Sequence, residues 1–192
     1  MKRITIVTTA ILAVAGAGGA FTDDGGRRIK ESLSGVKEAA AVVSTTGTGT
    51  FRATINRDGD EIAYRLTFKD LEGDITQAHI HIGHPQNSGG IVLWLCQTAA
   101  NPAPAQVDSN PPQCFAPGGD PRNNPEGVEG TLTAADVRVQ AANGIAANEF
   151  AEVVRLIRAG RTYANVHTAK FPPGEIRSQI DDGDGGDHDH HD

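Results

Sequence analysis

Residues 51–69, FRATINRDGDEIAYRLTFK, contain two runs in which apolar and polar residues alternate. Successive side chains of a strand point to opposite faces, so this period of two is typical of a half-buried strand. The runs are separated by Arg57-Asp58-Gly59-Asp60, and an Asp-Gly pair favours a tight turn. The pattern therefore predicts a β-hairpin with one apolar row, made of Phe51, Ala53, Ile55, Ile62, Tyr64, Leu66 and Phe68.

Further strands are expected on both sides of a single helix. They cover Ile75–Ile82, Ile91–Cys96, 163–168 and 175–180, and the second is apolar on both faces, which favours a central strand covered on both sides. The helix carries Phe150, Val153, Val154 and Ile157 on one stripe. Low aromatic content (5%), 23 glycines and 10 prolines suit short strands joined by turns. The expected fold class is mostly β, an antiparallel Greek-key β-sandwich or barrel with one short helix.

The two ends of the chain differ from its middle. Residues 1–20 combine a basic start, an apolar stretch and small residues, which is typical of a signal peptide, and the apolar run is too short to span a bilayer comfortably. Residues 21–32 are polar and are expected to form a linker. Residues 181–192 contain only Asp, Gly and His, a composition typical of disorder. We therefore expect a secreted, periplasmic or cell-surface protein with no membrane span after signal cleavage, and the net charge of −7 argues against a nucleic-acid partner.

Cys96 and Cys114 are the only cysteines. They lie near and within residues 101–129, which are rich in proline and are expected to form a long loop. An oxidising compartment would allow the pair to form a disulfide that pins this loop. A loop of this size would be stabilised by roughly 3 kcal/mol in the chain-entropy model.

Several spaced motifs resemble one known family. Residues 78–83 (AHIHIG), 163–168 (YANVHT) and 171–177 (FPPGEIR) look like the signature motifs of CHRD, or chordin-type, domains. Weaker matches are Leu33-Ser34-Gly35 with Glu38, Gly47-Thr48-Gly49, Gly130-Thr131-Leu132-Thr133 with Asp136, and Ala159-Gly160. The resemblance covers residues 33–180 and implies a single-domain member of an extracellular family. Growth-factor binding, which is known for animal chordin, is not carried over to a chain with one such domain.

Three histidines of these motifs are candidate metal ligands. His79 and His81 share one face of their strand, opposite Ala78, Ile80 and Ile82, so the polar row should lie outside the core. His167 lies on the corresponding face of a later strand. Three neutral imidazoles with an open position suit copper or zinc, and His84 or Glu175 could supply a fourth ligand. The His-x-His strand with a distant third histidine also resembles, locally, copper-zinc superoxide dismutase, although no zinc-binding subloop is visible in the sequence.

A structural role is the alternative for the same surface. Asn165, Glu175 and Arg177 share the outer face of the last strands, where they could form a polar network with the histidines, including an Arg177–Glu175 pair, that holds the long loop over the sheet. His188, His190 and His191 form a separate, weaker signal for metal capture by the tail.

Three hypotheses for function follow. The first is a non-catalytic extracellular binding or structural module whose partner is a protein, a surface polymer or a second copy of the chain. The second is a copper- or zinc-binding protein that uses His79, His81 and His167. The third, which has the least support because the zinc half is absent, is a superoxide dismutase-like enzyme. No phosphate-binding loop or nucleophile motif favours another enzyme class.

Overall fold

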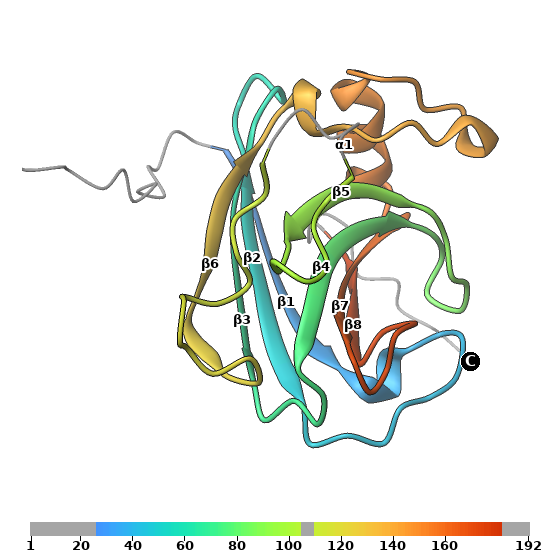
Figure 1. Ribbon diagram of the computed structural model, residues 1–192. Coiled ribbons are helices and arrows are strands. Elements are labelled where there is room, and N and C mark those ends of the chain that lie inside the picture. Colours follow the sequence, from blue (N-terminus) through green and yellow to red (C-terminus); the bar gives the residue numbers. More distant parts are fainter. Residues whose placement is uncertain (1–25, 105–109, 182–192) are drawn as a thin grey trace, which may run out of the picture.

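The computed structural model describes residues 26–104 and 110–181, and they form one antiparallel sheet of eight strands that curls into a nearly closed barrel (Figure 1). The signal-peptide prediction (1–20) and the tail prediction with His188, His190 and His191 concern residues outside this part of the chain. The strands are β1 (Arg27–Ser34), β2 (Thr48–Ile55), β3 (Ile62–Lys69), β4 (Ile75–Ile82), β5 (Ile91–Cys96), β6 (Asn124–Leu132), β7 (Thr162–Thr168) and β8 (Ile176–Ile180).

The hairpin β2–β3 forms as the alternation predicts. Phe51 pairs with Leu66 and Ile55 with Ile62, so both apolar rows enter the barrel together. The Asn56 side-chain oxygen accepts hydrogen bonds from the backbone N–H groups of Gly59 and Asp60, which closes the turn.

The strand order, β5-β4-β7-β8-β1-β2-β3-β6, brings together strands that are distant in the chain. After the β1–β2–β3 meander the chain crosses to the β4–β5 hairpin, returns to β6 beside β3, and crosses again to β7, which lies between β4 and β8. The predicted antiparallel, barrel-like fold with one helix is confirmed. This order makes β4, β7 and β8 direct neighbours, as the histidine hypothesis requires.

Helix α1 (Phe150–Arg158) covers one end of the barrel (Figure 1). Its buried face is the predicted stripe, Phe150, Val153, Val154 and Ile157. Within the described residues, three 3-10 turns complete the regular structure: η1 (Gly35–Lys37), η2 (Ala134–Asp136) and η3 (Ala141–Asn143). The Thr133 and Asp136 side chains form a capping box at η2.

The disulfide between Cys96 and Cys114 is confirmed, with a Cα–Cα distance of 4.9 Å across 18 residues. The loop that it pins is shorter than predicted, because residues 124–129 belong to β6. Only Val128 and Leu132 of this strand are buried, and Gly127 has a positive φ of 84°, so the apolar alternation that would reveal a strand is missing.

Two other expectations need correction. The predicted linker is wrong for residues 27–32, which form most of β1: only Ile29 and Leu33 of this strand are buried, so its polar composition hides it. Strand β5 is covered on both faces, as predicted, but it lies at one end of the sheet and not at its centre. Its outer face is buried because chain segments, and not further strands, cover this half of the barrel.

Candidate metal centre

The predicted polar row runs across β4, β7 and β8 on the outside of the barrel. In register, His79 pairs with Asn165, which pairs with Arg177, while His81 pairs with Tyr163. The expectation that this row forms an outer surface is wrong: His79 and Arg177 are each only 1% exposed. The row faces away from the barrel interior, as its parity requires, but other parts of the chain bury it.

The loop between β4 and β5 is one of these covers. The Arg177 guanidinium donates to the carbonyl oxygens of Asn87 (3.0 Å) and His84 (2.8 Å), and the Gln179 amide donates to that of Gly83 (2.8 Å). The Tyr163 hydroxyl accepts from the Gly89 N–H at 2.9 Å. The polar row therefore braces residues 83–90, and not the disulfide-pinned loop as predicted.

Arg177 also stacks on Tyr163, with its guanidinium carbon 3.4 Å from the ring centre. The His81 ring stacks on the Tyr163 ring as well. The two rings are nearly parallel, with 6° between their planes and 4.8 Å between their centres. These contacts fix the His81 ring from its flat side.

His79, His81 and His167 converge as the sequence predicts. One nitrogen from each ring lies within 4.8 Å of the others. The Nε2 atoms of His81 and His167 are only 3.3 Å apart. Two nitrogens that each lie about 2.0–2.1 Å from one ion are separated by about 3.3–3.6 Å at tetrahedral or trigonal angles. His81 and His167 are therefore already spaced as two ligands of one ion, while His79 stands somewhat farther away.

The hydrogen bonds of His81 and His167 determine where their protons lie. His81 Nδ1 contacts the Gly89 carbonyl oxygen and His167 Nδ1 contacts the Pro172 carbonyl oxygen, both at 2.9 Å. A carbonyl oxygen only accepts, so each Nδ1 must carry the proton and donate. Burial lowers the pKa of His81 to about 4 and also lowers that of His167, so both rings are neutral at pH 7.

Two unprotonated Nε2 atoms therefore face one another at 3.3 Å. No proton is available to join them, and two lone pairs at this distance repel. A cation between them would convert the repulsion into two bonds. A carbonyl that accepts from Nδ1 is also the usual partner that orients a metal-binding histidine.

Gly89 allows the close approach of the carbonyl that holds His81. A Cβ atom on this residue would lie 1.6 Å from the carbonyl oxygen of Ile82, so any other residue would push the loop away from β4. The loop backbone thereby belongs to the site, although none of the grouped ligand atoms comes from residues 83–90.

His79 is the least satisfied member of the group. Neither of its ring nitrogens has a hydrogen-bond partner, although both are buried. Burial, followed by the positive charges that His167, His81 and Arg138 would present, lowers its pKa well below the usual value, so this ring is neutral too. The Trp94 ring contacts it edge to face, with centroids 4.2 Å apart. A neutral imidazole with a free lone pair is the form that binds a metal ion.

The two candidates for a fourth ligand do not join this group. Glu175 is fully buried, and its carboxylate accepts hydrogen bonds from Thr45 Oγ1, Glu72 N, Gly73 N and Thr168 Oγ1. His84 is exposed, and only its carbonyl oxygen takes part, through Arg177. The suggested Arg177–Glu175 pair does not form either, because the carboxylate points to the turn that precedes β4.

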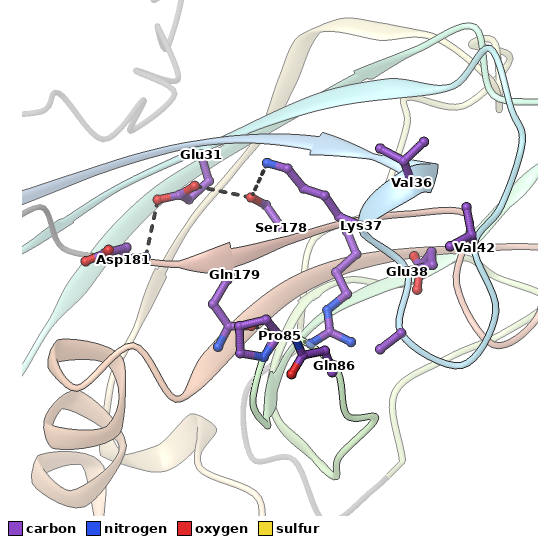
Figure 2. A pocket seen from close by; sticks show the side chains of 12 residues that line it. Glu31, Val36, Lys37, Glu38, Val42, Pro85, Gln86, Ser178, Gln179 and Asp181 are labelled. Atoms are coloured by element: carbon purple, nitrogen blue, oxygen red, sulfur yellow. Dashed lines mark hydrogen bonds between the residues drawn. The ribbon is translucent and has the colours of Figure 1, made fainter. Parts of the chain in front are cut away.

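A pocket of about 630 Å³ opens beside this row, over β8. Figure 2 shows Val36, Val42 and Glu38 on one side and Pro85 and Gln86 across from them. Glu38 is buried, and burial raises its pKa to about 7 against the opposing effects of Arg177 and a hydrogen bond with Asn165. The three histidines do not line this pocket, so it is separate from the histidine group.

Sequence reasoning missed several parts of the site. Trp94 and the carbonyl of Gly89 contact the histidines but carry no motif of their own, and the stacking of Tyr163, although it opens the YANVHT motif, was not predicted. The signal that could have found Trp94 is its position as the only tryptophan, in an apolar strand that follows the His-x-His strand. Glu38 stood out only through the family resemblance.

A family model for the CHRD domain matches residues 29–180. The chain belongs to the CHRD family. The match begins within β1 and ends with β8, so this CHRD domain comprises the whole barrel and is slightly longer than the predicted 33–180. No curated protein and no solved structure matches the chain. Within residues 26–104 and 110–181, no helix is long and apolar enough to cross a membrane.

Proposed function

We propose that this CHRD-domain protein is an exported extracellular module that holds one copper or zinc ion between His79, His81 and His167. Export is supported by the family, by the disulfide, which persists in oxidising compartments, and by the signal-like residues 1–20. The proposal assigns metal binding to the module and no reaction.

One observation carries the metal proposal. The Nε2 atoms of His81 and His167 face one another at 3.3 Å while both Nδ1 protons are held by carbonyl oxygens. A purely structural pair of histidines would share a proton through one N–H···N hydrogen bond, which this arrangement does not allow. The two unpartnered nitrogens of His79, beside the same gap, point the same way.

The residues present fit such an ion. Nε2 of His81 and of His167 would be ligands, and His79 would supply the third nitrogen after a small movement of its ring. An ion of this kind would bind the lone pairs of Nε2 of His81 and His167 and of one nitrogen of His79, none of which has a proton donor. Arg177 and Tyr163 would keep His81 in place. Tyr163 stacks on its ring, and Arg177 holds the loop whose carbonyl accepts the hydrogen bond from His81 Nδ1.

The test is metal loading of the full chain in which His188, His190 and His191 are replaced by alanine, so that the tail cannot contribute. We expect one copper or zinc ion per chain by elemental analysis. Emission from Trp94, the only tryptophan, should change on loading because its ring contacts His79. At one hundred times the dissociation constant, the ion should stabilise the fold by about 2.7 kcal/mol.

Matched variants identify the ligands. His167→Ala should abolish the stoichiometric ion, whereas His84→Ala, which removes an exposed histidine outside the group, should leave it unchanged. Absence of any bound copper or zinc, or equal binding by the His167→Ala variant, would overturn the proposal. Circular dichroism of each variant shows whether the barrel remains folded.

A further inference from the structure

The charge around the metal centre differs from that of most sites for divalent ions. The three grouped ligands are neutral histidines, and no carboxylate in the described part of the chain belongs to the group. The charged side chains that act on the imidazoles are positive: Arg138 on His79 and Arg177 on His81. A cation bound here would meet two arginines and no anionic ligand.

Burial makes this charge pattern matter. His79 is 1% exposed, Trp94 lies on its edge, and Tyr163 covers the flat side of His81. The cost of moving an ion from water into such surroundings grows with the square of its charge, and its repulsion by a fixed arginine grows in proportion to the charge. A divalent ion therefore bears about four times the desolvation cost and twice the repulsion of a monovalent ion.

One carboxyl that compensates part of this charge is that of Glu38, beside Arg177. Glu38 acts on Arg177 and shares a hydrogen bond with Asn165. When ionised it offsets the charge of Arg177, but Arg138 lies on the other side of the histidines, against β5, where its backbone N–H bonds the carbonyl of Val92. The excess positive charge near His79 therefore persists in either protonation state of Glu38.

The number of ligands that the protein supplies also favours a monovalent ion. Zinc sites in proteins almost always have four ligands, and where only three come from the protein a water molecule completes the set. Here the carboxylate of Glu175 is held by four other donors, and the side chain of His84 lies outside the group. The indole of Trp94 packs against the His79 ring, with the ring centroids 4.2 Å apart. Three neutral nitrogens suit Cu(I), a monovalent ion that is stable with three ligands.

We infer that the His79, His81 and His167 centre selects monovalent copper over divalent zinc and divalent copper. This inference rests on the proposed function and specifies its ion. The two arginines act as the selective element, because they repel a doubly charged ion twice as strongly as a singly charged one.

The first experiment measures affinity by ion. The full chain with the tail histidines replaced by alanine is titrated with Cu(I) without oxygen in competition with a Cu(I) chelator, and with Zn²⁺ and Cu²⁺ in competition with chelators for those ions. Ag⁺ serves as a second monovalent probe that undergoes no redox chemistry. We expect tighter binding of Cu(I) than of either divalent ion, with Ag⁺ displacing Zn²⁺ at the same site.

The outcomes separate the two proposals. Tighter binding of Zn²⁺ or Cu²⁺ than of Cu(I), at one ion per chain and dependent on His167, would overturn the selection and leave the proposed metal site intact. Failure of all four ions to bind would overturn both.

A second experiment tests the cause. The Arg138 side chain forms no hydrogen bond or ion pair with the described residues, so Arg138→Gln should remove its charge without disturbing the fold. If the change tightens Ag⁺ binding by some factor, it should tighten Zn²⁺ binding by about the square of that factor, because Coulomb energy is linear in the ion's charge. Arg138→Lys keeps the charge and should behave like the natural chain. Equal factors for Ag⁺ and Zn²⁺, or no change in either, would show that Arg138 does not set the selectivity.

Discussion

The two halves of the barrel share one sequence pattern and differ in what covers it. In β2 and β3, apolar side chains enter the barrel and polar ones such as Arg52 and Arg65 point to solvent. In β4, β7 and β8 the same alternation places histidine, asparagine and arginine outside the barrel, but loops and Trp94 bury them. Alternation thus identifies the face that lies outside the barrel. Whether that face is exposed to solvent depends on the loops and side chains that cover it.

The buried polar groups of the covered half fall into two classes, those with hydrogen-bond partners and those without. Glu175 and Arg177 are buried with several hydrogen bonds each, which is the usual requirement for a buried charge. Both nitrogens of His79, Oδ1 of Asn165 and Nε1 of Trp94 are buried without partners. Such unpartnered groups destabilise a fold, and a local conflict of this kind is most common at functional sites. The difference therefore separates the residues that brace the loop from the candidate metal site.

The largest expected contrast between the halves comes from their arginines. Arg177→Ala leaves the carbonyl oxygens of His84 and Asn87 without their donor and removes the stack on Tyr163. We expect a loss of about 3 kcal/mol in the free energy of unfolding, measured by urea denaturation. The matched change Arg52→Ala, on the exposed half, should alter this value by no more than about 0.5 kcal/mol. Similar losses in the two variants would mean that the cover over β8 contributes nothing.

The elements that the sequence predicted differ from those that it missed in how they are encoded. The hairpin, four further strands, the helix stripe and the disulfide were predictable because each is encoded locally, by alternation, by a period of 3.6 or by two cysteines. β1 and β6 were not, because each buries only two apolar side chains among charged residues and glycine. A prediction from alternation fails where a strand is held mainly by its backbone pairing.

The site shows the same division. Strand parity and the family motifs placed His79, His81 and His167 on one side of the sheet, and the structure brings them together. The burial of His79 and His81 could not be predicted, because it depends on contacts from other segments: Trp94 packs on His79, and the loop of residues 83–90, which approaches β4 closely at Gly89, holds His81. The separation of Glu175 from Arg177 was also beyond parity arguments, because Glu175 precedes β8 and turns toward Glu72 and Gly73.

A second expected effect is a dependence on pH that belongs to the covered half. The pKa of Glu38 is raised to about 7 from its ordinary 4.5, mainly by burial, while Arg177 opposes the rise and Tyr163 lies near enough to feel the carboxylate. A carboxyl whose folded pKa exceeds the unfolded one stabilises the fold below pH 4.5, and this contribution is lost as pH rises through about 7. Glu38→Gln, which stays neutral, should therefore gain in stability relative to the natural chain between pH 4.5 and 7.

The stability of Glu38→Gln must be compared with that of the natural chain at each pH, because the metal-free histidines change the pH dependence of stability in the opposite direction. Their pKa values are lowered by burial, so their contribution is lost as pH falls below 6.5. Thermal unfolding of both chains across pH 4–8 gives the difference curve, and Glu61→Gln on the exposed turn of the other half controls for the loss of one charge. A flat difference curve for Glu38→Gln would mean that its carboxyl titrates in the folded chain as it does in the unfolded one.

The smallest expected effect is the sharpest test of what the two histidines of β4 are for. His79→Leu replaces a ring whose two buried nitrogens have no partners, so the metal-free chain should become more stable by about 1 kcal/mol. His81→Leu removes the donor to the Gly89 carbonyl and the ring stacked on Tyr163, so it should lower stability by about 1–2 kcal/mol.

If the two substitutions change the free energy of unfolding in opposite directions, His79 destabilises the metal-free fold, as expected of a residue kept as a ligand. His81 would then contribute both to stability and to metal binding. Urea denaturation in the presence of a chelator isolates the metal-free chain. If His79→Leu is destabilising there, its ring contributes to packing against Trp94 in a way that outweighs its two lost hydrogen bonds, and the argument from its unpartnered nitrogens fails.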